Sequence, residues 1–278
     1  MQNTSAIPRS ELGKGTKARI IVVPTAEAMQ QAFVDDVASL LRERNAQGRS
    51  LSVILPVGPV QFRPLAERLN RDRLDLRRFY VFPMDEFCNE TGERVSEDHP
   101  LSLRGFLRRE LVDLLDPSLG FRAANLTPPD AANPSAYVHR MSEVGGVDVA
   151  YTGLGINGHL AFNEPEPEMD VEEYARLSVR LVRLSPATIV QMAMGGTDGD
   201  LLGIPSRAVT VGMRELLAAR EIHGYFPRRW HSAALRRALH GPVTPAFPAS
   251  YLQRHPNVVI TVPAYVAEPP EIIVTQRL

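Results

Sequence analysis

Short apolar runs alternate along the chain with longer stretches whose apolar positions recur at helical spacing. The short runs predict strands at residues 19–23, 51–55, 79–84, 147–152, 208–211, 221–225 and 258–262. The longer stretches predict helices at residues 26–44, 62–71, 100–115, 214–219 and 230–240. In the first of these helices, Thr25 is the expected N-cap, and Met29, Phe33 and Val37 fall on one face.

Apolar strands that alternate with amphipathic helices are typical of an α/β fold. The order predicts a three-layer Rossmann-like sandwich, with a mostly parallel sheet and helices on both faces. Residues 1–18 are polar and are interpreted as an N-terminal arm, followed by a single α/β domain over residues 19–278. Ligands of such sheets bind outside the carboxyl ends of the strands, and three of these ends, at residues 56–62, 83–86 and 153–165, carry unusual side chains.

Charge and cysteine content narrow the class of protein. The chain has 31 basic and 32 acidic residues, for a formal net charge of -1, which argues against a nucleic-acid or anionic-membrane partner. Its one cysteine, Cys88, cannot form an intrachain disulfide, so a reducing cytoplasm is the expected location. We expect no membrane helix, because no apolar run approaches the roughly 20 residues required. No histidine pair has zinc-site spacing, so no metal site is predicted.

The segment 153–165, GLGINGHLAFNEP, is the richest in chemistry. It has three glycines that allow a tight turn close to a ligand, and four polar side chains: Asn157, His159, Asn163 and Glu164. The spacing also fits a dinucleotide loop, but a histidine directly after the last glycine would crowd a pyrophosphate, and no ribose-binding acid is evident. An imidazole near a carboxylate instead favours proton transfer, because the carboxylate can orient the ring and raise its basicity.

A second segment, FPMDEF at residues 82–87, ends an apolar strand with two adjacent acids. Asp85 and Glu86 must point in different directions, so only one can face a pocket at the strand end. A carboxylate held there can act as a base toward a carbon acid. The alternative for either acid is to cap the helix that follows.

These residues resemble the motifs of the glucosamine-6-phosphate deaminase/isomerase family. The resemblance covers residues 19–265 and rests on five segments: Met84-Asp85-Glu86-Phe87, His99-Pro100-x-Ser102-x-x-x-Phe106, the segment 153–165, Thr210-Val211-Gly212, and Phe247-Pro248-Ala249-Ser250-x-Leu252-x-x-His255. The FNEP ending distinguishes this family from the related 6-phosphogluconolactonases, which share the glycine-histidine core.

The resemblance implies an enzyme and assigns roles by position. Asp85 would move a proton between C1 and C2 of an open-chain amino sugar, and His159 would assist ring opening, oriented by Glu164. Asn157 stands where many members have aspartate, so it can position His159 without supplying charge. The implied reaction expels ammonia and yields a ketose phosphate, with no metal or organic cofactor. Further substrate contacts are expected at Gly58, Glu86, Gly155, Gly158 and Asn163.

The chain departs from the family at the phosphate-binding loop. Where the family has a sequence resembling TGGTP, this chain reads Val57-Gly58-Pro59-Val60-Gln61, which has no hydroxyl and loses one N–H donor at Pro59. Two explanations stay open. Either an anion site is rebuilt from Arg63, Arg228, Arg229 or His231, or the substrate is not a 6-phosphosugar.

Two other functions fit the same residues. A 6-phosphogluconolactonase-like hydrolase would need His159 to activate water but would not need Asp85 as a carbon base. A non-catalytic sugar-binding regulator would keep the fold without the chemistry. In each case the partner is a small-molecule sugar or sugar phosphate. The family occurs as monomers and as hexamers, so a homo-oligomer is one alternative.

Overall fold

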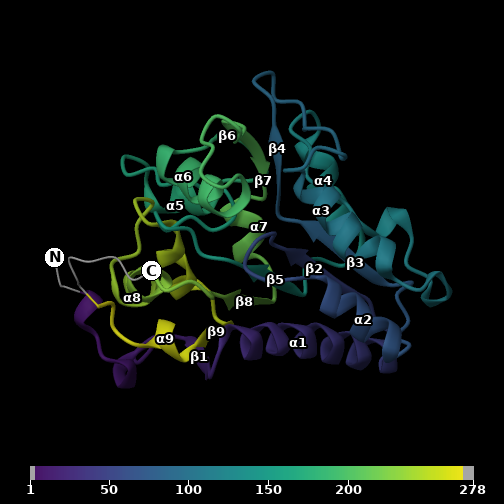
Figure 1. Ribbon diagram of the computed structural model, residues 1–278, viewed down its shortest axis with the longest axis horizontal. Coiled ribbons are helices and arrows are strands. Elements are labelled where there is room, and N and C mark those ends of the chain that lie inside the picture. The colour runs from purple at the N-terminus through teal and green to yellow at the C-terminus, as the bar shows by residue number, and fades with distance from the viewer. Residues whose placement is uncertain (1–3, 272–278) are drawn as a thin grey trace.

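Residues 4–271 are described by a computed structural model of the chain, built around a six-stranded sheet (Figure 1). Every neighbouring pair of its strands is parallel. The order across the sheet is β1 (Ala18–Val23), β9 (Val258–Pro263), β8 (Glu221–Tyr225), β5 (Val149–Thr152), β2 (Leu51–Leu55) and β3 (Phe79–Pro83). The predicted mostly parallel sheet is confirmed.

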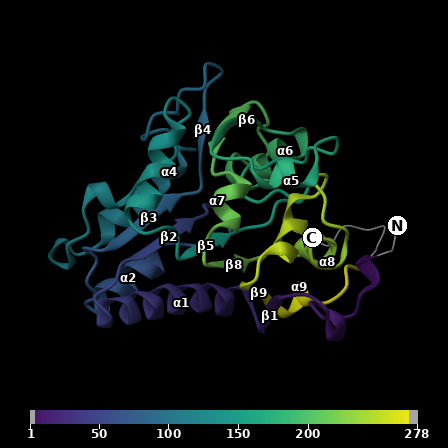
Figure 2. The same ribbon diagram turned by 180° about the vertical axis from the view of Figure 1, so that it is seen from behind.

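Helices cover both faces of this sheet, because its central strands bury alternate side chains on each side. On β2, Val53 and Leu55 pack toward one face, while Ile54 packs toward the other. The first face is covered by α1 (Ala26–Ala46), α2 (Arg63–Arg71) and α3 (Leu103–Glu110). The second is covered by α4 (Pro134–Glu143), α7 (Met213–Leu217), α8 (His231–His240) and α9 (Ala264–Ala267). Figures 1 and 2 both show α1 running along the lower edge of the molecule.

A second, antiparallel sheet of three strands was not predicted. It has the order β4 (Asp85–Cys88), β7 (Arg207–Thr210) and β6 (Arg180–Arg183). Figure 1 shows this sheet close to α5 (Val171–Ala175) and α6 (Pro186–Gly196). Only one residue, Met84, separates the end of β3 from the start of β4. The chain therefore passes from the main sheet into the small one at Asp85.

Several element boundaries differ from the predicted ones for local reasons. The helix expected at residues 100–115 begins at Leu103, because the Ser102 hydroxyl accepts a hydrogen bond from the Gly105 N–H and caps it. It ends at Glu110 and continues as a 3₁₀ turn. The 3₁₀ segments of the described chain are Thr4–Ala6, Arg9–Glu11, Val112–Leu114, Pro117–Leu119, Ala123–Asn125 and Pro248–Arg254.

The N-terminal segment from residue 4 packs against α8 and α9. The buried guanidinium of Arg236 donates hydrogen bonds to the carbonyl oxygens of Ile7, at 2.7 Å, and Ala267, at 2.6 Å. This side chain thus ties both ends of the described chain to α8. Among residues 4–271, no helix has the length and apolar character needed to cross a membrane.

Candidate active site

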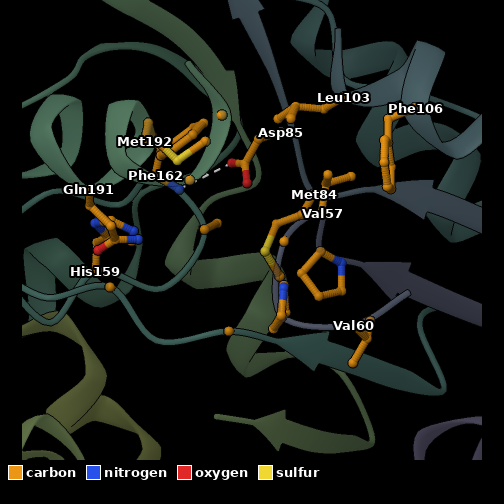
Figure 3. A pocket seen from close by; sticks show the side chains of 18 of the residues that line it. Val57, Val60, Met84, Asp85, Leu103, Phe106, His159, Phe162, Gln191 and Met192 are labelled. Carbon is orange, nitrogen blue, oxygen red and sulfur yellow. Dashed lines mark hydrogen bonds between the residues drawn. The ribbon is translucent and has the colours of Figure 1, made fainter. Parts of the chain in front are cut away.

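A cavity of about 420 Å³ opens at the carboxyl ends of the parallel strands, within the usual range for small-molecule sites. Its wall comes from six parts of the chain: the loop 56–61 after β2, residues 84–87 around the start of β4, residues 100–106 at the start of α3, the loop 153–162 after β5, one side of α6, and the loop 227–231 after β8. Asp85 and His159 both line it, so the two chemically active groups predicted from separate segments share one cavity (Figure 3).

The carboxyl group of Asp85 is buried where the two sheets meet. The Phe162 N–H donates two hydrogen bonds, one of 3.1 Å to Asp85 Oδ1 and one of 3.0 Å to Thr210 Oγ1. Burial raises the pKa of Asp85 to about 7, with repulsion from Glu86 adding to the effect and the Thr210 and Phe162 hydrogen bonds opposing it. A carboxyl group with such a pKa is a stronger base than ordinary aspartate and still ionises near neutral pH.

Glu86, the adjacent acid, points away from the cavity. Its carboxylate accepts hydrogen bonds from the Ser102 hydroxyl at 2.9 Å and from the backbone N–H groups of Leu103 and Arg104, each at 3.0 Å. Glu86 therefore caps the N-terminus of α3, the alternative that the sequence left open for one of the two acids. Glu86 was expected to contact the substrate, but it does not line the cavity.

The His159 ring lies over Gly155 and contacts α6. A Cβ atom at position 155 would stand 2.3 Å from the ring, so glycine is required there for the ring to occupy this place. The Nδ1 atom is 3.1 Å from the hydroxyl of Thr188. Nε2 has no hydrogen-bond partner among residues 4–271 and is not sealed from solvent, so it opens into the cavity. Burial lowers the pKa of His159 to about 4, opposed by the charge of Glu164, so the ring is neutral at pH 7.

Glu164 reaches His159 only through intermediate groups. Its Oε2 accepts a hydrogen bond of 2.7 Å from the Asn157 amide, and its Oε1 accepts one of 3.0 Å from the Ser185 N–H. The Asn157 amide also donates to the Ser185 hydroxyl at 3.0 Å, while its Oδ1 accepts the His159 N–H at 3.1 Å. Glu164 and Asn157 therefore lie behind the imidazole, outside the cavity lining, and Thr188 is the residue that contacts the ring nitrogen.

The hydrogen bonds around Thr188 favour one tautomer of His159. The Ser185 hydroxyl accepts from the Asn157 amide and from the Thr188 N–H, so its own hydrogen goes to Thr188 Oγ1 at 3.1 Å. Thr188 Oγ1 then accepts from Ser185 and donates its own hydrogen to His159 Nδ1, 3.1 Å away. Nδ1 is then the acceptor, and the ring hydrogen lies on Nε2, the atom that opens into the cavity.

The remaining glycines and amides of the motifs divide between the cavity and the scaffold. Gly58 and Gly155 line the cavity, whereas Gly158 has a φ of +91° and packs against the Phe247 ring. Asn163 is fully buried: its amide donates to the Leu160 and Val211 carbonyl oxygens, each at 2.9 Å. Gly158 and Asn163 thus stabilise the turn that carries His159, and the structure does not bring them into the lining.

Of the four candidates for a rebuilt anion site, two lie outside the cavity. Arg63 is paired with Glu110 at 3.3 Å, and Arg229 lies over the ring of Tyr265, 5.1 Å from its centroid. The other two, Arg228 and His231, line the cavity.

His231 cannot supply charge to an anion. Its Nδ1 accepts a hydrogen bond of 2.8 Å from the Arg228 N–H, and Nε2 is 3.0 Å from the Leu154 carbonyl oxygen, to which it donates. Burial lowers the pKa of His231 to about 3, so the ring is neutral at physiological pH. Of the four candidates, only Arg228 therefore brings a positive charge to the cavity wall, and it forms no ion pair with residues 4–271.

Sequence reasoning missed the contribution of α6 altogether. This helix supplies Thr188, whose hydroxyl meets His159, and Gln191, whose Oε1 accepts a 2.7 Å hydrogen bond from the Ile156 N–H. The available signal was Ser185-Pro186, a serine N-cap followed by proline at the first helical position, which predicts a helix start. Within residues 4–271, no cluster of histidine, cysteine and acidic side chains is arranged to hold a metal ion.

Comparison with known proteins gives the family of the chain. It is 32% identical over 200 residues to a glucosamine-6-phosphate deaminase of Rhodopirellula baltica, covering 70% of this chain and 73% of that protein. The chain belongs to the glucosamine-6-phosphate deaminase family. A second relative, the glucosamine-6-phosphate deaminase of Streptomyces coelicolor, is 27% identical over 245 residues, covering 87% of this chain and 89% of that protein. No family model matches the chain.

Solved structures agree with the family on the fold. A monomeric glucosamine-6-phosphate deaminase superimposes with a TM-score of 0.75 at 21% identity, covering 90% of this chain and 98% of that one. A 6-phosphogluconolactonase of Thermotoga maritima superimposes with a TM-score of 0.61 at 17% identity, covering 88% and 99%. The three-layer α/β architecture is therefore shared by deaminases and lactonases, and the reaction has to be argued from the site.

Proposed function

We propose that the chain converts a 2-amino sugar and water into a ketose and ammonia. The observation that carries this proposal is that the Asp85 carboxyl group and the Nε2 edge of His159 open into one cavity. One group is a base of raised pKa, and the other is a neutral hydrogen-bond donor. Membership of the glucosamine-6-phosphate deaminase family supports the same reaction.

In the proposed reaction, the Asp85 carboxylate removes the proton from C2 of the open-chain aldehyde. The electron pair of that C–H bond forms a C1–C2 double bond, and the carbonyl oxygen takes a proton from solvent water to become an enol hydroxyl. Protonation at C1 by the Asp85 carboxylic acid then gives a C2 iminium ion. Water adds to C2, ammonia leaves as ammonium with the proton taken up at the oxygen step, and the C2 ketone remains. The raised pKa of Asp85 suits both proton transfers, because a group near pH 7 gives and takes a proton with similar ease.

His159 acts as a hydrogen-bond donor in this scheme. With its hydrogen on Nε2, the neutral imidazole can donate to the ring oxygen as the pyranose opens and to the carbonyl oxygen as negative charge develops there. Thr188, Ser185, Asn157 and Glu164 hold the ring in the tautomer that makes this donation available. The residues that touch substrate are thus Asp85 and His159, and the others position the imidazole.

This tautomer favours the deaminase over a lactonase. A lactonase would use an unprotonated imidazole nitrogen at the cavity to accept a proton from water, but the nitrogen without a hydrogen is Nδ1, which faces Thr188. The lactonase also gives no role to Asp85, whose buried carboxyl group opens into the cavity. A non-catalytic sugar-binding regulator leaves the raised pKa of Asp85 unexplained as well.

An ammonia-release assay tests the proposal. Purified protein is incubated separately with glucosamine 6-phosphate, glucosamine and 6-phosphogluconolactone, and ammonia, ketose and acid are measured. We expect ammonia and ketose in equal amounts from at least one amino sugar, and no rate above the spontaneous one with the lactone. Saturable sugar binding without any product would instead favour the regulator, and accelerated lactone hydrolysis would favour the hydrolase. A cytoplasmic location stays a prediction from the sequence, and a monomer and a homo-oligomer stay open as alternatives.

A further inference from the structure

The charge of the cavity wall carries an inference about the substrate. Among the described lining residues, the acidic or basic side chains are Asp85, Arg228 and the two neutral imidazoles of His159 and His231. Most of the wall is apolar or glycine, and its apolar side chains include Val57, Pro59, Val60, Leu101, Phe106 and Met192. In Figure 3, Asp85 lies in the middle, with Val57, Val60 and Phe106 to one side of it and His159 to the other side. The reacting end of a sugar belongs near Asp85 and His159, so its remote end meets this apolar wall.

The loop 56–61 offers an anion fewer backbone donors than an unbroken glycine-rich loop would. Pro56 and Pro59 have no N–H, and the Gln61 N–H already donates to Gln30 Oε1 at 2.8 Å. The N-terminus of α2 would be the next source of donors, but no residue from 62 to 65 lines the cavity. The N–H groups of Val57, Gly58 and Val60 are the backbone donors that remain, and the loop supplies neither a hydroxyl nor a cation beside them.

The charged groups do not match a phosphate ester either. A phosphate monoester carries a charge of about -1.5 to -2 at pH 7. Arg228 supplies a single positive charge from an exposed position, and His231 beside it is neutral with both ring nitrogens engaged by backbone groups. Ionised Asp85 adds a negative charge to the same cavity. Binding a 6-phosphate would therefore leave much of its charge uncompensated against apolar side chains.

We propose that the substrate is an unphosphorylated 2-amino sugar whose end remote from C1 is uncharged and apolar, as in a 6-deoxyhexosamine, and that Val57, Val60 and Phe106 contact this end. The inference rests on the proposed function for the position of C1 and C2. C1 must be free because the ring has to open to the aldehyde, so any additional group is carried at C3 to C6. A methyl group at C5 fits an apolar wall better than a phosphate ester or a hydroxymethyl group.

Binding is tested with analogues that cannot react. Reduction of the C1 aldehyde of glucosamine gives 2-amino-2-deoxyglucitol, and reduction of glucosamine 6-phosphate and of 2-amino-2,6-dideoxyglucose gives its 6-phosphate and its 6-deoxy form. Each analogue is titrated into the full chain by calorimetry. We expect the 6-phosphate to bind at least tenfold more weakly than the 6-deoxy form. A 6-phosphate that binds more tightly than both analogues without phosphate, with its advantage lost in Arg228→Ala, would overturn the inference by showing that one arginine is enough.

A matched pair of variants tests the position of the remote end. Val57 is half-buried on the wall, and Val57→Arg adds a cation there, while Val57→Met adds similar length without charge. We expect Val57→Arg to bind the 6-phosphate analogue at least tenfold more tightly than Val57→Met, with no such difference for the 6-deoxy analogue. Equal affinity of the two variants for the 6-phosphate would contradict the placement of the remote end at this wall.

Turnover separates the failure of this inference from the failure of the proposed function. Ammonia release is measured with glucosamine 6-phosphate, glucosamine and 2-amino-2,6-dideoxyglucose. The inference predicts the highest kcat/KM for the 6-deoxy sugar and the lowest for the 6-phosphate. The highest kcat/KM for the 6-phosphate would refute the inference and leave the deaminase function standing. Ammonia from none of the three would refute the proposed function and, with it, the substrate assigned here.

Discussion

The hydrogen bond from Thr188 to His159 gives the most specific prediction about the positioning of the imidazole. In Thr188→Val the side chain keeps its shape but loses the hydroxyl, so His159 Nδ1 and the hydrogen of Ser185 both lose their partner. Thr188 is fully buried, and an unpaired buried polar group costs about 1–3 kcal/mol. We expect the free energy of unfolding to fall by about 2 kcal/mol.

The catalytic effect of Thr188→Val follows from the tautomer. Without the Thr188 donor, nothing favours the hydrogen on Nε2, and a loss of about 1.4 kcal/mol in transition-state stabilisation lowers kcat about tenfold. KM should change little, because Thr188 does not line the cavity. Thr188→Ser keeps the hydroxyl and is the matched control. Nitrogen NMR of the imidazole should show the Nε2–H form in wild type and Thr188→Ser, and a mixture in Thr188→Val. Equal kcat for the two variants, or an Nδ1–H ring in wild type, would refute this reasoning.

Three further predictions concern the pH dependence of kcat/KM, the space beside the His159 ring and the stability of the fold above neutral pH. Because Asp85 acts as the ionised base, kcat/KM should rise with pH to a plateau above about 7, and a profile flat from pH 5 to 8 would contradict this. Gly155→Ala should lower kcat about 100-fold by displacing the His159 ring, whereas Gly145→Ala, at a turn with open space, should not. The pKa of Asp85 is higher in the folded state than in the unfolded state, so ionisation of Asp85 destabilises the fold as pH rises from about 4 to 7. At pH 8, Asp85→Asn should therefore be more stable than wild type by about 2–4 kcal/mol in urea unfolding. A variant less stable than wild type would refute the burial of an ionised carboxyl group at this position.

The main sheet could be predicted from the sequence because its strands are buried on both faces. Such strands are short and mostly apolar, as Leu51–Leu55 is, and this strand has the predicted boundaries. Glu221–Tyr225 also has the predicted boundaries, although it includes Glu221 and His223. The small sheet has weaker signals. Its β6 (Arg180–Arg183) is an edge strand with arginine at both ends and no buried residue, so its composition does not distinguish it from a loop.

In the candidate site, the motifs could be predicted from local sequence, whereas contacts between residues far apart in the sequence could not. The segments around Asp85 and His159 could be identified because each is a local motif after a strand, and strand ends of a parallel sheet converge. The contact of His159 with Thr188 joins residues 29 positions apart, and the direction of Glu86 depends on the backbone N–H groups of α3. Neither the contact of Thr188 nor the direction of Glu86 can be predicted from local sequence alone. The same holds for Glu164, whose expected direct contact with the imidazole is replaced by hydrogen bonds through Asn157 and Ser185.

The most direct test of the account follows the hydrogen at C2. The 2-amino sugar with the highest kcat/KM is prepared with deuterium at C2, and NMR measures the loss of that label together with its appearance at C1 or in the solvent. We predict that wild type removes the deuteron with a primary isotope effect on kcat, and that Asp85→Asn, folded and still able to bind the sugar, removes it at least 1,000-fold more slowly (about 4 kcal/mol in the barrier). Label loss at the wild-type rate in Asp85→Asn would contradict the assignment of this carboxyl group as the base.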